Sequence, residues 1–319
     1  GVTFANSKFV SVGTDGTIIN SSDNGTTWIP RTSGTTNHLR DVIYANSKFV
    51  SVGSSGTIIT SDNGTTWTSM TSGTTKGLRA IAYGCILPAC TRSISTFVTV
   101  GESGTILTSS DGISWEDRTD TNVVSRKLRG VTYGSSNDPK FVAVGRTGTI
   151  LTSSNGYGTS WTRIDDSGTT KKLNGITYGN STFVTVGNSG TILTSTDGTT
   201  WTSLTPVTTE NLNGVTYDNS LFVAEGDSGT ILTSSDGTTW TSLTPVTTEG
   251  LRGITYENST FVAVGYDGTI LTSSDGTTWT SVSVGNSGIS WTSVTSPTAN
   301  NLYGVTFGNN TFVGVGVSG

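Results

Sequence analysis

The strongest constraint on the fold is an internal repeat that runs along the whole chain. A phrase of the form Leu-x-Gly-(Val/Ile)-Thr-Tyr recurs with small variations, and the strand-like segments that it opens begin 39 to 51 residues apart. These segments begin at Gly1, Asp41, Ala80, Gly130, Gly175, Gly214, Gly253 and Gly304. A period of about 40 residues with four short strands per unit is typical of a β-propeller, in which blades pack around an axis.

The unit 214–252 shows the physical reasons for this prediction. Its four segments, GVTY, LFVAEG, GTILTS and WTSL, carry the β-branched and aromatic residues that suit pleated, half-buried strands. Asn-Ser, Ser-Gly and Asp-Gly pairs between them supply the positive φ that tight hairpins require. One such sheet cannot bury both of its faces alone, whereas blades packed around a ring can. We therefore expect an all-β fold, a single β-propeller domain over 1–319 made of four-stranded antiparallel blades.

The number of blades depends on how the end of the chain is used. The units are 1–40, 41–79, 80–129, 130–174, 175–213, 214–252 and 253–303, followed by the partial unit 304–319. We expect seven blades, with one hairpin surplus, displaced or paired elsewhere. The alternative is an eight-bladed ring whose incomplete last blade is finished by another segment or chain, for which the insertion Ser281 to Val294 is a candidate. A surplus hairpin leaves an open edge, so we also expect self-association through 304–319.

Composition excludes several classes of protein. The chain has 17 Lys and Arg against 22 Asp and Glu, a net charge of −5, and this acidic balance argues against a nucleic-acid partner. No apolar run approaches the roughly 18 residues of a membrane-spanning helix. One His and two Cys are too few for a His-rich or Cys-rich metal site, so we expect no metal and no cofactor.

The turn between the third and fourth segments carries a recognisable motif. The segments 22–28 and 60–67 follow S-x-D-x-G-x-x-W to within one position, and shorter versions end at Trp115, Trp201, Trp240 and Trp279. This motif resembles the Asp-box, or BNR, repeat. Together with F-V-A-V-G-x-x-G-T-I-L-T, it makes the chain similar to bacterial propellers of the photosystem II stability and assembly factor type. The resemblance implies the fold but not the function, because Asp-box propellers include sialidases, lectin-like proteins and assembly factors.

The carboxylates of this motif are expected to be structural. An Asp in such a turn accepts hydrogen bonds from the backbone N–H groups that follow it, and the nearby Trp fills the space between blades. A group that recurs once per blade around a ring cannot converge on one substrate. The expected structural residues are Asp23, Trp28, Asp62, Trp67, Asp111, Trp115, Trp161, Asp197, Trp201, Asp236, Trp240, Asp275 and Trp279, with Asn155 in place of Asp in the fourth unit.

Cys85 and Cys90 bear on the cellular compartment. They lie in an insertion, GCILPACTRSIST, and their spacing around a Pro favours a disulfide that closes a small loop, with free thiols as the alternative. A disulfide implies an oxidising compartment. We therefore expect an extracellular, cell-surface or periplasmic location; the start at Gly1 fits removal of a leader and equally fits trimming.

A candidate binding face lies where the inner strands begin. If the first strand of each unit lines the axis, the residues just before it surround one mouth of a central channel, and four of them are Arg, which suits carboxylate or phosphate ligands. Pairing with neighbouring Asp residues or with exposed carbonyls is the structural alternative. Glu225 replaces a core Val and is costly to bury unless it is paired or near water. The candidate binding residues are Arg40, Arg79, Arg129, Asn174, Asn213, Glu225, Arg252 and Tyr303.

These observations favour a non-enzymatic, extracytoplasmic binding or scaffold propeller. Its partner is expected to be a protein or a glycan, in protein–protein or adhesive contacts at a cell surface. The alternatives are a glycan-binding lectin and a sialidase-like glycoside hydrolase. For the latter, the resemblance implies three Arg and a Tyr activated by Glu, which Arg residues of the mouth with Glu225 and Tyr266 would imitate. The chain lacks the Arg-Ile-Pro type motif of such enzymes, and we expect no catalytic residues.

Overall fold

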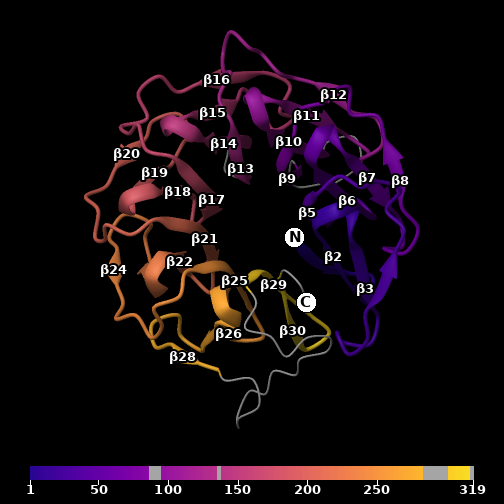
Figure 1. Ribbon diagram of the computed structural model, residues 1–319. Coiled ribbons are helices and arrows are strands. Elements are labelled where there is room, and N and C mark those ends of the chain that lie inside the picture. The colour runs from indigo at the N-terminus through magenta and orange to yellow at the C-terminus, as the bar shows by residue number, and fades with distance from the viewer. Residues whose placement is uncertain (86–94, 135–137, 283–300, 317–319) are drawn as a thin grey trace.

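The computed structural model describes residues 1–85, 95–134, 138–282 and 301–316. Strands and short 3₁₀ turns account for the regular structure of these residues, and they form a closed ring (Figure 1). The predicted Cys85–Cys90 disulfide lies outside what the structure describes, as does the insertion beyond Val282. No helix in the described ranges is long and apolar enough to cross a membrane.

Seven four-stranded antiparallel sheets form the blades, each in simple meander order. The first blade consists of β1 (Val2–Ala5), β2 (Lys8–Val12), β3 (Ile18–Ser21) and β4 (Ile29–Arg31), and the second of β5 (Leu39–Ala45), β6 (Lys48–Gly53), β7 (Ile58–Ser61) and β8 (Thr68–Met70). The third blade consists of β9 (Leu78–Cys85), β10 (Ser95–Gly101), β11 (Ile106–Ser109) and β12 (Glu116–Asp117), and the fourth of β13 (Leu128–Gly134), β14 (Lys140–Gly145), β15 (Ile150–Ser153) and β16 (Trp161–Arg163). The fifth blade consists of β17 (Leu173–Gly179), β18 (Thr182–Gly187), β19 (Ile192–Ser195) and β20 (Thr202–Ser203). The sixth consists of β21 (Leu212–Asp218), β22 (Leu221–Gly226), β23 (Ile231–Ser234) and β24 (Thr241–Ser242), and the seventh of β25 (Leu251–Glu257), β26 (Thr260–Gly265), β27 (Ile270–Ser273) and β28 (Thr280–Ser281). The predicted propeller of seven four-stranded blades is confirmed.

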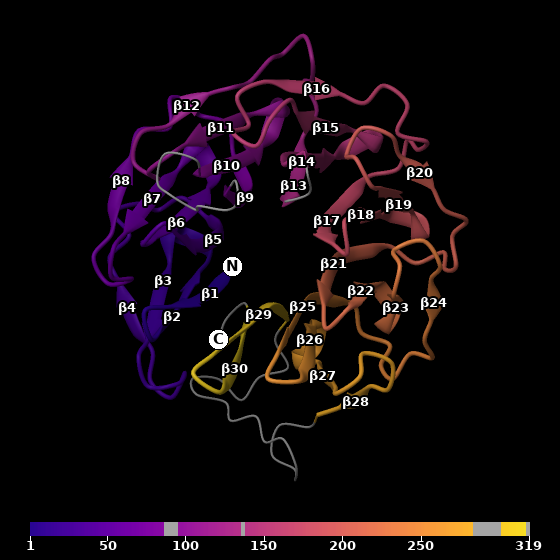
Figure 2. The ribbon, with the colours of Figure 1, turned by 180° about the vertical axis from the view of Figure 1, so that it is seen from behind.

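The terminal hairpin takes an eighth position in the ring. Strands β29 (Leu302–Gly308) and β30 (Thr311–Gly316) form a two-stranded sheet, and β29 contacts both β25 of the seventh blade and β1 of the first. The view from behind shows this hairpin between the seventh and first blades, close to both chain ends (Figure 2). The hairpin is therefore not displaced: in the part of the chain that the structure describes, the ring consists of seven complete blades and this two-stranded unit.

The hairpin turns have the geometry that their residues predict. At the first turn of the second blade, Asn46 and Ser47 both have positive φ, 48° and 62°, as a type I′ turn requires. The turn from second to third strand is a short 3₁₀ segment, such as η6 (Asp227–Gly229), whose central Ser228 has φ 54°. Short polar residues tolerate this left-handed region better than β-branched ones do.

The hydrophobic core lies between neighbouring blades. In one cluster, Val184 and Val186 of the fifth blade pack against Phe222, Leu232 and Trp240 of the sixth. The ring centroids of Phe222 and Trp240 are 6.3 Å apart, and the same tilted Phe–Trp contact recurs in other blades. Each buried side chain of this size contributes about 2 kcal/mol of hydrophobic stabilisation. The ring is thus held together by one repeated interface.

Candidate functional site

Seven of the eight predicted binding residues, all except Glu225, occupy one repeated backbone position, a β-bulge in the inner strand. In the second blade Leu39 faces Gly53 and Asp41 faces Val52, so Arg40 is an extra residue without a partner in the ladder. The same register shift recurs in the third to seventh blades and in the two-stranded unit. Bulges re-aim a side chain and raise local twist. We call these residues the bulge ring: Arg40, Arg79, Arg129, Asn174, Asn213, Arg252 and Tyr303.

The bulge ring lies on the innermost strands. Strands β5, β9, β13, β17, β21, β25 and β29 surround the centre of the molecule (Figure 1). On the same side, the turn after each second strand donates a backbone hydrogen bond to the connection that enters the inner strand, as from Asp227 N to the Asn211 carbonyl at 2.9 Å. The bulge residues therefore have turn residues of their own blade as neighbours.

One half of the bulge ring is basic. Arg40 donates from Nη2 to Ser54 Oγ at 3.0 Å, and Arg79 pairs loosely with Glu102, with 3.4 Å between Nη2 and Oε1. Glu102 is shared, because Lys127 Nζ lies 2.9 Å from the same oxygen. Arg129 forms neither a hydrogen bond nor an ion pair with any described residue. The guanidinium groups thus outnumber the carboxylates available to them here.

The charges of this half repel one another. Burial lowers the pKa of Arg79, and the charges of Arg40 and Arg129 lower that pKa further. Burial also lowers the pKa of Arg129, followed by the charges of Arg146 and Arg40. Lys172 has a lowered pKa for the same reasons, burial first and then Arg129 and Arg146. We call Arg40, Arg79, Lys127, Arg129, Arg146 and Lys172 the basic half; Glu102 is the one carboxylate that pairs with it among the described residues.

The other half of the bulge ring is paired within the molecule, although Asn174 Oδ1 and Arg252 Nε have no hydrogen-bond partner. Asn174 donates from Nδ2 to the Leu212 carbonyl of the next blade at 2.8 Å. Asn213 does the same to the Leu251 carbonyl at 3.0 Å and also reaches Asp227 Oδ1 at 3.1 Å. These two amides therefore tie the fifth blade to the sixth and the sixth to the seventh.

Arg252 completes this second half. Its Nη2 lies 3.1 Å from Asp227 Oδ1, and its guanidinium carbon lies 4.3 Å from the centroid of the Tyr266 ring. Partial burial acts to raise the pKa of Asp227, but hydrogen bonds from Asn213 and Asn211 and the charge of Arg252 outweigh it, so the pKa is lowered. Tyr303, the exposed bulge residue of the two-stranded unit, contacts Tyr266 edge to face. Arg252 is thus neutralised and stacked, unlike Arg129.

Glu225 is buried without compensation. Its side chain is 2% exposed, and Oε2 has no hydrogen-bond partner. A Cβ on Gly214, the residue opposite in β21, would lie 2.3 Å from Oε1, so the carboxyl group occupies the space that the glycine leaves. Burial raises the pKa of Glu225 to about 8, and the charge of Arg252 opposes that rise only in part. Arg252 itself pairs with Asp227 instead.

The turns between third and fourth strands are built as structural units. Asp236 Oδ1 accepts hydrogen bonds from the N–H groups of Thr238 and Thr239 at 2.7 and 2.8 Å, and from Ser234 Oγ at 2.9 Å. These bonds lower the pKa of Asp236 far below the usual range. The Trp240 indole closes the turn by donating to the Gly237 carbonyl at 3.1 Å.

The structure corrects the prediction for Asp62. In the second blade Asn63, not Asp62, accepts from the N–H groups of Thr65 and Thr66 at 2.8 and 2.9 Å. Asp62 stands one position earlier, where its carboxylate is exposed and pairs with Lys48 at 2.5 Å. In the first blade, by contrast, Asp23 stands two positions before the glycine and still accepts from the Thr27 N–H at 2.9 Å, so the residue that bonds the turn amides differs between these two blades.

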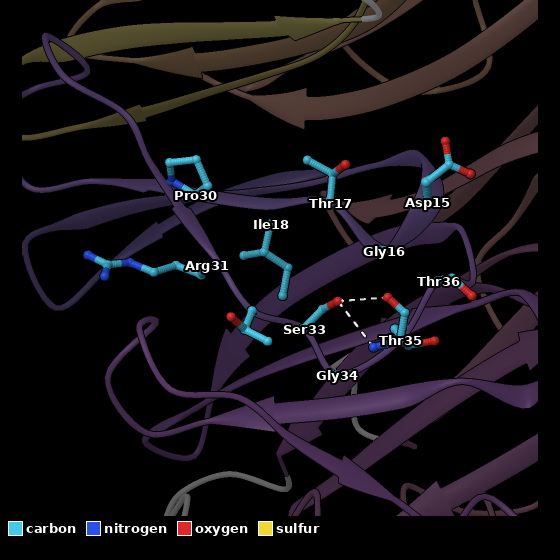
Figure 3. A pocket seen from close by; sticks show the side chains of 11 residues that line it. Asp15, Gly16, Thr17, Ile18, Pro30, Arg31, Ser33, Gly34, Thr35 and Thr36 are labelled. Carbon is cyan, nitrogen blue, oxygen red and sulfur yellow. Dashed lines mark hydrogen bonds between the residues drawn. The ribbon is translucent and has the colours of Figure 1, made fainter.

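Two shallow hollows lie in the surface. One of about 720 Å³ lies at the first blade between the turn at Asp15 and Gly16 and the loop Thr32–Thr36, where Ser33 Oγ bonds the Thr35 backbone (Figure 3). A second of about 510 Å³ lies along 165–171. Neither hollow includes a bulge-ring residue. Within the described part of the chain, no group of three or more His, Cys, Asp or Glu side chains is placed to hold a metal ion.

Sequence reasoning missed the turn residues that decide which bulge residues are paired. Glu102, Arg146 and Asp227 each open the turn after a second strand, and each lies beside a bulge-ring residue. Lys127 and Lys172 come from the connections that precede the inner strands. The available signal was the variability of these turns among otherwise uniform repeats.

Comparisons with known proteins agree on the fold. The family model of the DUF6242 beta propeller domain matches residues 129–244, which is 116 of the 319 residues. No curated protein is significantly similar in sequence. The crystal structure of the computationally designed Ika8 protein superposes with a TM-score of 0.70 at 13% identity, covering 98% of this chain and 91% of that one.

Two solved structures of YCF48 are also similar. YCF48 bound to D1 peptide has a TM-score of 0.61 at 19% identity and covers 84% of this chain and 88% of its own. YCF48 from Cyanidioschyzon merolae has a TM-score of 0.58 at 17% identity, with coverages of 85% and 93%. At these identities the likeness establishes the β-propeller fold.

Proposed function

We propose that this chain is a non-enzymatic binding or scaffold propeller that holds an acidic segment of a protein partner at its basic half. The observation that carries the proposal is the excess of cationic groups there: of the six cations, Arg79 and Lys127 pair with Glu102, and the other four form no ion pair with a described residue. A guanidinium group that is half-buried and unpaired gains more from a carboxylate ligand than an exposed one does.

The comparisons support a protein partner over other ligands. YCF48, a propeller of similar fold, has been solved with D1 peptide bound, and this supports a peptide segment as the partner. The side chains of the bulge ring also lie on rigid inner strands, which favours a preformed site. We also propose that the chain is an Asp-box propeller, that it lies outside the cytoplasm, and that it makes adhesive contacts at a cell surface.

The binding test uses a labelled synthetic peptide in which Glu alternates with Gly, and its Gln counterpart. We expect the Glu peptide to bind the full chain, as measured by fluorescence anisotropy. Its affinity should fall as the NaCl concentration rises, because salt screens charges beyond about 10 Å at 0.1 M. The combined variant Arg40→Gln, Arg79→Gln, Arg129→Gln should bind at least about tenfold more weakly, a loss of about 1.4 kcal/mol.

A charge-matched control separates the site from net charge. The variant Lys8→Gln, Arg118→Gln, Arg163→Gln removes as many cations outside the basic half and should bind like the wild type. Equal loss in both variants, or equal binding of the Gln peptide, contradicts the proposal.

The two alternatives have their own readouts. Turnover of a fluorogenic sialoside would establish the sialidase-like reading, and selective binding on a glycan array would establish the lectin. Thiol trapping of Cys85 and Cys90 in intact cells tests the compartment: reactive thiols would contradict an oxidising location.

A further inference from the structure

The two-stranded unit presents an edge that every complete blade covers. In each complete blade the second strand pairs on one side with the inner strand and on the other with a third strand, whereas β30 pairs only with β29 among the described residues. The sequences of β26 and β30 are nearly the same, TFVAVG and TFVGVG. Phe261 and Val264 of β26 are fully buried, but Phe312 and Val315 of β30 are only half-buried. Because the two sequences are nearly the same, we attribute the difference in burial to the third strand, which β30 lacks among the described residues.

The hydrophobic clusters on the two sides of the seventh blade differ in their residues, and the difference shows which side chains the two-stranded unit lacks among the described residues. The cluster between the sixth and seventh blades includes Phe261, Leu271 and Trp279 of the seventh blade. The cluster between the seventh blade and the two-stranded unit contains Phe312 as the counterpart of Phe261. Within the described residues, it has no counterpart of the third-strand Leu or of the Trp that follows it.

The seven complete blades also define the strand that fits. Their third strands read IINS or IITS in the first two blades and ILTS in the other five. In β26 and β27 the register is Phe261 with Ser273, Val262 with Thr272, Ala263 with Leu271 and Val264 with Ile270. Transferred to β30, this register places Ser, Thr, Leu and Ile of an incoming strand opposite Phe312, Val313, Gly314 and Val315.

We propose that the outer edge of β30 accepts an extended segment with the third-strand pattern G-T-I-L-T-S from a partner polypeptide, which completes the eighth blade by β-augmentation. Backbone hydrogen bonds to the open edge provide affinity, and the Leu of the segment fills the incomplete cluster beside Val262 and Ile270. The third strands of this chain's own blades are all paired, so donating one of them would open a complete blade. This proposal goes beyond the binding at the basic half and does not depend on it.

The direction of the backbone groups on β30 follows from the first blade. Val12 donates its N–H to Gly1 in the inner strand at 2.9 Å, whereas Gly13 donates away from it, to Thr17 at 3.0 Å. Val12 and Gly13 correspond to Val315 and Gly316 of the two-stranded unit. Because donors alternate along a strand, the N–H of Gly314 points away from β29, toward the open edge.

The test titrates the full chain with a labelled peptide of residues 228–237, SGTILTSSDG. We expect saturable binding by fluorescence anisotropy, and no binding of the same peptide with Pro in place of its Leu. The variant Gly314→Pro removes the outward N–H and should weaken binding at least about tenfold. Its matched control is Gly314→Ala, because Ala stands at the equivalent position in β14, β22 and β26 and keeps the N–H. Circular dichroism melting checks that all three proteins are folded.

Three outcomes would overturn the proposal. Absence of binding at about 1 mM peptide means that the edge is already covered, for instance by residues 283–300 of the same chain. Equal binding to the wild type and Gly314→Pro places the peptide elsewhere. A dimer in sedimentation without peptide that Gly314→Pro dissociates assigns the edge to a second copy of this chain, the self-association expected from 304–319.

Discussion

The two halves of the bulge ring use the same backbone position in opposite ways. In the fifth, sixth and seventh blades, Asn174, Asn213 and Arg252 have partners within the molecule: the two amides donate to the next blade, and the guanidinium pairs with Asp227. In the fourth blade, Arg129 has no described partner, and its charged neighbours repel it. The bulge supplies a place for a side chain, while the adjacent turn decides whether that side chain is structural or free to bind.

This difference separates stability from function within one repeat. Satisfied polar groups between blades help to hold the ring closed, whereas unpaired cations impose a cost that a ligand would remove. Functional sites commonly retain such local conflicts. The contrast between the halves is therefore testable by stability measurements alone, without a known partner.

Glu225 should give the largest effect, since it is a fully buried carboxyl group whose Oε2 has no hydrogen-bond partner. The Glu225→Val protein should be more stable than the wild type by about 2 to 4 kcal/mol at pH 8, because Val stands at the equivalent position in β26 and a buried carboxyl group is removed. Denaturant unfolding at several pH values measures this gain.

The pH dependence of this effect has a definite sign. The pKa of Glu225 is raised to about 8 in the fold, above its ordinary value of 4.5. Below that ordinary value the group is protonated in both states and imposes no ionisation cost. As pH rises toward about 8 the unfolded chain loses the proton first, so the wild type loses stability over this range. Glu225→Gln keeps the shape and should remove this slope; a wild-type slope identical to that of Glu225→Gln would show that the carboxyl group is hydrated or paired.

Arg252 and Arg129 test the contrast directly. Arg252→Gln should cost about 1 to 2 kcal/mol, because Asp227 loses its ion pair and Tyr266 its stacked cation. Arg129→Gln should not lower stability at any ionic strength. Thermal unfolding of both variants in one buffer measures the difference, and equal losses would mean that Arg129 has a partner in solution.

The repeat was sufficient to predict the strands, the hairpin turns and the four-stranded blades. Their cues are local: paired turn residues such as Asn46-Ser47 select positive φ, and runs such as FVAVG select a strand buried on both faces. Glu225 was also found from sequence, as one break in a column of Val residues. Features that repeat within a unit were thus readable from the chain alone.

Contacts between the inner strands and the turns beside them could not be predicted from the sequence in the same way. The extra residue of the bulge appears only once Leu39 and Asp41 are aligned with Gly53 and Val52. Whether Arg252 meets Asp227, or Arg129 meets Arg146, depends on side-chain directions across that bulge. The shift from Asp62 to Asn63 likewise needed the positions of the turn amides.

Asn213 tests whether the amides hold neighbouring blades together. Asn213→Ala removes the donor to the Leu251 carbonyl and should cost about 1 kcal/mol, the net value of one hydrogen bond in a partly buried site. The control is the same substitution in an Asp227→Ala background, where Asn213 has the Leu251 carbonyl as its remaining partner and its loss should cost about the same. Urea unfolding measures both costs; loss of the effect in the Asp227→Ala background would assign it to Asp227 rather than to the bond between blades.

The smallest expected effect concerns the repulsion within the basic half. Arg129→Gln removes one of several like charges and should raise stability by about 0.5 kcal/mol at low ionic strength, because Arg146 and Arg40 both act to lower the pKa of Arg129. The gain should vanish in about 0.5 M NaCl, where screening acts within a few ångströms. Arg163→Gln, at an exposed position in β16, provides the matched loss of one charge and should show no gain. A gain in stability that persists at high salt would come from packing rather than from charge. It would contradict the proposal that repulsion among these cations favours binding of an anionic ligand.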